Sequence, residues 1–208
     1  MSKKDRKLTK KELQRKSVFE ELCKDMEAKG YQKKDFTISA IKINVLSIII
    51  MLPFVILMAV LYGVVQAGGI GKQEISIFWF VILMIICTIL HELIHGLVWG
   101  LYAKHGFRAI NFGIIWSSLN PYCTCSEPLN KKQYMIGTIM PTLIIGFSLC
   151  GIAIIINNAI LYVVAQLMIL VGGGDFYIVW KLLFYRTRNK DIVCLDHPYE
   201  IGLCIFEK

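Results

Sequence analysis

The sequence predicts an all-α membrane protein. We expect four transmembrane helices, a cytoplasmic amphipathic helix at the N-terminus, and a small β-hairpin loop between the second and third spans. Two observations carry this fold class. Hydrophobic residues make up 56% of the 208 positions and charged residues only 18%, less charge than a soluble domain of this size carries. Apolar runs long enough to cross a bilayer occur four times, and each such helix satisfies its own backbone within lipid.

The chain divides by composition into a basic N-terminal segment (1–42), a membrane-embedded domain (43–185) and a C-terminal tail (186–208). In the first segment, apolar residues recur at the spacing of one helix face: Phe19, Leu22, Cys23 and Met26. Such a helix either lies on anionic lipid or a partner, or covers the membrane domain as a solvated helix. We expect the second arrangement.

The spans and the hairpin follow in order along the membrane-embedded domain. Pro53 and Pro141 predict kinks within the first and third spans, because proline removes a backbone donor. Residues 109–116 are rich in β-formers, 117–121 form a turn-like break, and 122–125 can return as a strand. The spans themselves are expected at 44–66, 76–103, 134–156 and 159–184.

The positive charges predict the orientation. Thirteen of the 23 Lys and Arg residues precede Asn44, the next three loops carry one, four and none, and five follow from Lys181 onward. This alternation places both termini and the hairpin in the cytoplasm of a multi-pass protein of the cell membrane. It also accounts for the net charge of +8, and since no groove-reading or base-stacking motif accompanies the charges, we expect no nucleic-acid partner.

The second span carries the motif His91-Glu92-Leu93-Ile94-His95 within an otherwise apolar stretch. On a helix, HExxH places both histidines one turn apart on one face, with the glutamate beside them. This is the arrangement of two Zn²⁺ ligands and a general base. A charge at membrane depth costs about 2.5–3.5 kcal/mol on insertion scales, so a bound cation would compensate for it. The alternative is a structural pair of buried histidines.

Asp175 is the expected third ligand. The second and fourth spans run in the same direction, and His91 and Asp175 lie fifteen and sixteen residues into them. At about 1.5 Å per residue, the two side chains reach nearly the same depth. Apart from Glu92, no other span residue has a carboxylate. The glycines at 172–174 would let the fourth helix approach closely or unwind locally, although they could also form a small-residue packing face.

These residues predict an integral membrane zinc metallopeptidase that hydrolyses peptide bonds within or near the membrane. His91, His95 and Asp175 would hold one Zn²⁺ per chain, and Glu92 would be the catalytic base. The partners would be a peptide or membrane-protein substrate and the lipid bilayer. The alternative is a non-catalytic, metal-binding accessory or transporter-like membrane protein, and a scaffold that docks partners through the N-terminal helix is a third possibility.

Several segments together resemble the bacterial DUF3267 family of zincin peptidases. They are HELIHG in a membrane helix, Glu127-Pro128-Leu129 in the loop, a proline in the third span, Gly174-Asp175 in the fourth, and Asp196-His197-Pro198 with Gly202 in the tail. More distantly, the arrangement is similar to site-2 proteases, which carry an LDG motif where this chain has Gly174-Asp175-Phe176. The resemblance implies peptide hydrolysis in or beside the membrane, and a hairpin that holds substrate by strand addition.

Cysteine and the remaining histidines carry weaker signals. The seven cysteines are odd in number and scattered, which does not indicate a disulfide framework. Cys123 and Cys125 would share one face of a strand, and could bind metal or respond to oxidation, but we expect reduced thiols. His197 could be a further ligand or a substrate contact, and we expect a turn histidine before Pro198 instead.

Overall fold

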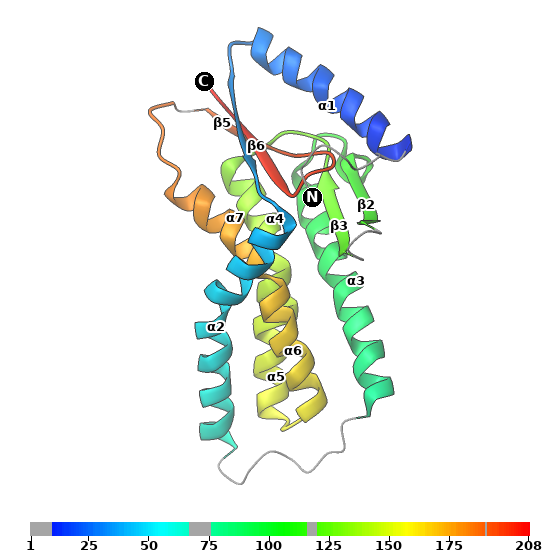
Figure 1. The fold of residues 1–208 in the computed structure, drawn as a ribbon, viewed down its shortest axis with the longest axis vertical. Coiled ribbons are helices and arrows are strands. Elements are labelled where there is room, and N and C mark those ends of the chain that lie inside the picture. The colour runs from blue at the N-terminus through cyan, green and yellow to red at the C-terminus, as the bar shows by residue number, and fades with distance from the viewer. Residues whose placement is uncertain (1–9, 67–75, 116–119, 190) are drawn as a thin grey trace.

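The computed structural model describes residues 10–66, 76–115, 120–189 and 191–208. It is mostly helical, with the apolar helices side by side and a layer of strands at the end where α1 and the C-terminus lie (Figure 1). The expected loop at 67–74 and most of the expected turn at 117–121 lie outside the described residues.

Within the described ranges, three helical segments are long and apolar enough to cross a membrane. The first two are α2 (Ala40–Val65) and α3 (Ile77–Tyr102). The third runs over Lys131–Ile155 through α4 (Lys131–Pro141), a π-helical segment (Thr142–Ser148) and α5 (Leu149–Ile155). The π-helical turns begin directly after Pro141, where the sequence predicted a kink.

The expected fourth span is two helices. α6 (Ala159–Val171) and α7 (Gly173–Phe184) are bent by 41° across Gly172, and count as one span only if the bent pair is taken together. The break falls within the glycine run. Asp175 therefore lies in the first turn of a new helix, where the helix dipole favours a carboxylate.

The prediction of an all-α chain is too narrow, because the N-terminal and C-terminal segments form one antiparallel sheet. Its strands are β1 (Gln32–Thr37), β6 (Gly202–Glu207), β5 (Ile192–Asp196) and the short β4 (Leu129–Asn130), in that order. The expected polar tail is thus two paired strands. Residues 32–37 of the N-terminal segment join them at the edge.

The two central strands of the sheet, β6 and β5, are largely buried on both faces. Side chains alternate along a strand, so Cys204 and Phe206 of β6 face α1 (Lys10–Ala28), where they pack with Phe19, Cys23 and Met26. Leu203 and Ile205 face the other way and pack with Trp99 of α3 and Leu182 of α7. The apolar face of α1 therefore covers the sheet, and not the apolar helices directly as the sequence predicted.

A two-stranded sheet lies beside α3 (Figure 1). β2 (Ile110–Ile115) pairs antiparallel with β3 (Asn120–Cys125), and a 3₁₀ turn (Gly106–Ala109) leads into it from α3. Gly96 of α3 makes room for the Phe112 ring, since a Cβ at Gly96 would lie 3.0 Å from Ile110 Cγ2 and closer to Phe112. Strand β3 thereby comes to lie near the HELIH segment.

Candidate metal centre

The HELIH motif lies on the buried face of α3. His91 and His95 are 3% and 5% exposed, and their ring centroids are 4.9 Å apart at an interplanar angle of 81°. The other buried residues of the helix follow the same helical spacing: Cys87, Gly96, Trp99 and Gly100. Both imidazoles are therefore presented to the interior of the helix bundle rather than to lipid.

Asp175 of α7 meets both histidines. Its Oδ2 lies 3.0 Å from His91 Nε2 and 3.4 Å from His95 Nε2. Ligands of a tetrahedral Zn²⁺ ion with bonds of about 2.0–2.1 Å lie roughly 3.3 Å apart. The three side chains offer one ligand atom each, all within 4.8 Å of one another, so that they could hold one metal ion.

The hydrogen bonding of His95 supports a cation at this position. Its Nδ1 lies 2.9 Å from the Gly137 carbonyl oxygen. A carbonyl only accepts, so Nδ1 carries the proton and Nε2 is the ring nitrogen that faces Asp175. In the neutral ring, Nε2 offers a lone pair, and a cation between it and the Asp175 oxygen 3.4 Å away would bind both atoms. The donor set thus fits a divalent metal such as zinc.

Helix α4 fixes the orientation of His95 from behind. Trp99 stacks on His95 with centroids 5.0 Å apart, and Tyr134 stacks on Trp99 at 5.4 Å. Trp99 Nε1 donates to the Tyr134 carbonyl oxygen at 3.1 Å. Gly137 leaves room for this stack, because a Cβ there would collide with the indole. The sequence analysis missed these residues, although Trp99 lies four positions after His95, on the same helix face.

The glycine break positions Asp175. A Cβ on Gly173 would lie 2.6 Å from Ser47 Cα, so α2 and α7 cross at a distance that only glycine permits. A Cβ on Gly172 would likewise collide with Thr142 of the third span. Close packing on two sides therefore holds the first turn of α7 in place, and with it the Asp175 carboxylate.

Glu92 lies on the edge of the same site. It is half-buried and lines a cavity of about 730 Å³ together with His91, His95 and Asp175. The backbone N–H of Cys123 in β3 lies near enough to act on the Glu92 carboxylate. The cavity continues between apolar side chains of α2, α3 and α6, and ends at the β5–β6 turn: Ile48, Met84, Leu167, Leu170 and residues 196–202.

The other candidate residues do not form a second metal cluster among the described parts of the chain. Cys123 and Cys125 are buried and form no disulfide, and burial raises the pKa of the Cys125 thiol to about 12, as expected of an unreactive thiol. His197 lies in the β5–β6 turn at the cavity wall, where its Nδ1 accepts from the Glu200 backbone N–H at 3.0 Å.

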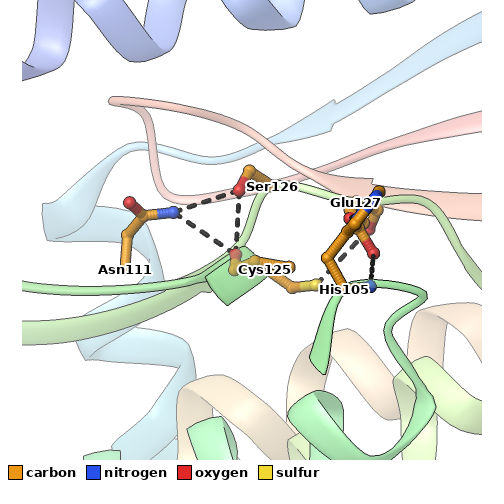
Figure 2. Close-up of polar contacts among 6 residues, drawn as sticks. His105, Asn111, Cys125, Ser126 and Glu127 are labelled. Atoms are coloured by element: carbon orange, nitrogen blue, oxygen red, sulfur yellow. Dashed lines mark hydrogen bonds and ion pairs between the residues drawn. The ribbon is translucent and has the colours of Figure 1, made fainter. Parts of the chain in front are cut away.

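Polar contacts hold the base of the hairpin beside α3 (Figure 2). Asn111 Nδ2 donates to Ser126 Oγ at 3.2 Å, and Ser126 Oγ donates to the Ala109 carbonyl oxygen at 2.8 Å. His105 Nδ1 is paired with the carboxylate of Glu127, a residue that closely follows β3 in the sequence. Glu127, from the motif used in the family resemblance, is therefore placed where it stabilises the hairpin rather than in the metal centre.

A model of the DUF3267 family, described as "Putative zincin peptidase", matches residues 84–189, just over half of the chain. The chain belongs to this family. The DUF3267 match includes the HELIH segment, the hairpin and the Asp175 turn, and it confirms the resemblance found in the sequence. It does not extend to α1, β5 or β6. No curated protein and no solved structure matches the chain.

Proposed function

We propose that this chain is an integral membrane zinc metallopeptidase that cleaves peptide bonds within or beside the membrane. The observation that carries the proposal is the convergence of His91 Nε2, His95 Nε2 and Asp175 Oδ2 next to Glu92. Membership of the zincin family supports it. Three protein ligands leave a fourth position open, as in catalytic rather than structural zinc sites.

Each residue has a defined task in this proposal. When bound, Zn²⁺ supplies Lewis acidity, which polarises a peptide carbonyl and acidifies water. The Nε2 atoms of His91 and His95 and the Asp175 carboxylate hold the ion. Glu92 takes the proton from the attacking water and returns it to the nitrogen of the leaving amine. The apolar cavity wall excludes bulk water and accommodates an extended peptide.

The Glu92→Gln variant separates a peptidase from a metal-binding protein. In purified full-length protein, we expect one zinc per chain in the wild type and in Glu92→Gln, and peptide cleavage only in the wild type. His91→Ala and Asp175→Ala should lose both zinc and cleavage. Cleavage that survives in Glu92→Gln refutes the mechanism, and zinc binding without any cleavage favours the non-catalytic alternative. Glu20→Gln, on the exposed face of α1, is the matched control.

We also propose that the sheet end of the molecule, with both termini, faces the cytoplasm. The support is the positive charge of the N-terminal segment and of the flanks after α3 and α7. A cysteine at Ser76, just before α3, should react with an impermeant thiol reagent added outside whole cells. Its labelling only from the cytoplasmic side would reverse this orientation.

A further inference from the structure

A second cavity adjoins the metal cavity. It measures about 480 Å³ and lies between α1 and the β2–β3 hairpin, within the size range of about 300–1,000 Å³ typical of ligand pockets. Val18, Phe19 and Ile110 form its apolar walls. The two cavities share a set of lining residues: Arg15, Tyr122, Thr124, Asp196 and Pro198. A bound peptide that leaves the metal cavity past these residues would enter the second cavity.

Arg15 marks the junction between the two cavities. One terminal nitrogen donates to the Tyr122 hydroxyl at 2.7 Å, and the other lies 3.5 Å from Thr124 Oγ1. The guanidinium carbon is 5.0 Å from the centroid of the Tyr122 ring. Tyr122 in turn lies flat against β2, since a side chain at Gly113 would collide with it. A helix residue is thus anchored on the hairpin at the edge of the metal cavity.

The hydrogen bonds of Arg15 are incomplete. Its Nε is buried and has no hydrogen-bond partner among the described residues. A guanidinium has five N–H donors in a planar fork, so that N–H groups of its two terminal nitrogens remain to bind one carboxylate while Tyr122 stays bonded. Such charge-assisted, bidentate bonds are the strongest that a side chain offers to a peptide.

The charges that line the cavities favour an acidic ligand at this point. Arg15 is the only lysine or arginine among the described lining residues of either cavity. The metal cavity carries Glu92, Asp175, Asp196 and Glu200, whereas the second cavity has only Asp196, which already accepts from Tyr134 and from the Cys125 N–H. Away from the metal ion, a carboxylate of the ligand would be repelled by these side chains in the first cavity and bound by Arg15 at the entrance to the second.

We propose that the cavity between α1 and the hairpin is a substrate subsite, and that Arg15 binds a carboxylate of the peptide there. The peptide runs from the metal toward α1, and it carries either an aspartate or glutamate side chain or its own C-terminal carboxylate at the junction. This inference rests on the proposed peptidase function and adds a substrate class to it: peptides with a negative charge a short distance from the cleaved bond.

Binding of defined peptides to the zinc-loaded Glu92→Gln protein in nanodiscs tests the subsite without cleavage. The probes are fluorescein-labelled peptides with an apolar Leu/Ala half and a Gly/Ser half, with one Glu placed at each position of the polar half in turn. Matched peptides carry Gln instead. A second pair differs only in a free or amidated C-terminus, which distinguishes the two sources of the carboxylate. Fluorescence anisotropy gives the Kd of each peptide.

We expect Glu at one or two adjacent positions, or the free C-terminus, to bind about tenfold or more tightly than its neutral match, the usual effect of a charged hydrogen bond. Arg15→Gln should abolish this preference, and Arg15→Lys should keep only part of it, because lysine retains the charge without the fork. Lys16→Gln, the neighbouring residue on α1, should leave it unchanged. Thermal melting of each variant checks that α1 remains folded on the sheet.

The outcomes separate the subsite from the peptidase. Equal binding of acidic and neutral peptides at every position, no binding by any peptide, or a preference that persists in Arg15→Gln overturns the subsite. An Arg15-dependent preference in a protein whose zinc-loaded wild type cleaves none of these peptides keeps the subsite and refutes the peptidase. Cleavage without any preference for acidic peptides keeps the peptidase and refutes the subsite.

Discussion

Asp196 is the clearest point at which pH should act on this fold. It lies at the end of β5, is 8% exposed, and accepts from the Tyr134 hydroxyl and, at 2.7 Å, from the Cys125 backbone N–H. These bonds join the sheet, helix α4 and the hairpin at one carboxylate. Burial raises the pKa of Asp196 from its ordinary value of 3.8 to about 6.

The sign and size of the effect follow from this pKa. The folded state binds the proton more tightly than the unfolded chain, so the stability that Asp196 contributes is fully present below pH 3.8 and is lost as the pH rises through about 6. One pKa unit is about 1.4 kcal/mol, which gives about 3 kcal/mol in total. About 2 kcal/mol of this falls between pH 4 and pH 7.

The Asp196→Asn variant isolates this contribution. Its amide cannot ionise, and it can still accept from the Cys125 N–H and contact the Tyr134 hydroxyl. The free energy of unfolding, measured by SDS titration in mixed micelles with zinc chelated, should fall between pH 4 and pH 7 by about 2 kcal/mol more in the wild type than in the variant. Asp191→Asn controls for removing an exposed carboxylate from the same segment. An equal pH dependence of wild type and Asp196→Asn refutes the reasoning.

Two glycine variants test the helix packing that orients the proposed metal ligands. Gly173→Ala places a Cβ 2.6 Å from Ser47 Cα, so α7 must shift, and we expect zinc affinity to fall about tenfold or more in a chelator competition titration. Gly137→Ala drives a Cβ into Trp99, behind the metal ligand on α3, and should weaken zinc binding similarly. Gly63→Ala, with nothing within 4 Å, is the control, and wild-type affinity in the first two variants would contradict this account.

The metal centre could be predicted from the sequence because its two halves obey simple geometric rules. HELIH follows from helical spacing, and Asp175 from equal depth on two helices of the same direction. The described structure brings these three side chains within 4.8 Å. The sequence could not predict that α2 and α7 cross at Gly173. A close approach of two helices depends on both helices, and its only trace in the sequence is a glycine in one of them.

The sheet was not predicted, because its strands are far apart in the sequence and differ in character. β1 pairs Gln32 with Glu207 of β6, at opposite ends of the chain. Most residues of β1 are polar and exposed, which hides it among loop residues. β6 is buried on both faces, so it lacks the alternation of a half-buried strand. Arg15 was missed for a related reason, since its partners on β3 are recognisable only once α1 covers the sheet.

The edge of β3 limits how a peptide can meet the hairpin. On one strand edge, N–H groups recur at every second residue. That of Cys125 donates to Asp196, and that of Cys123 lies near the Glu92 carboxylate. Strand addition, as the family resemblance implies, would have to displace Asp196 and compete with Glu92. Tyr122 and Thr124 line the junction of the two cavities instead. A peptide passing Arg15 would therefore lie across the hairpin face. N-methylation of alternate peptide amides should then leave the affinity of the peptide unchanged. If the peptide instead paired with the edge of β3, N-methylation would remove its backbone hydrogen bonds and the affinity would fall.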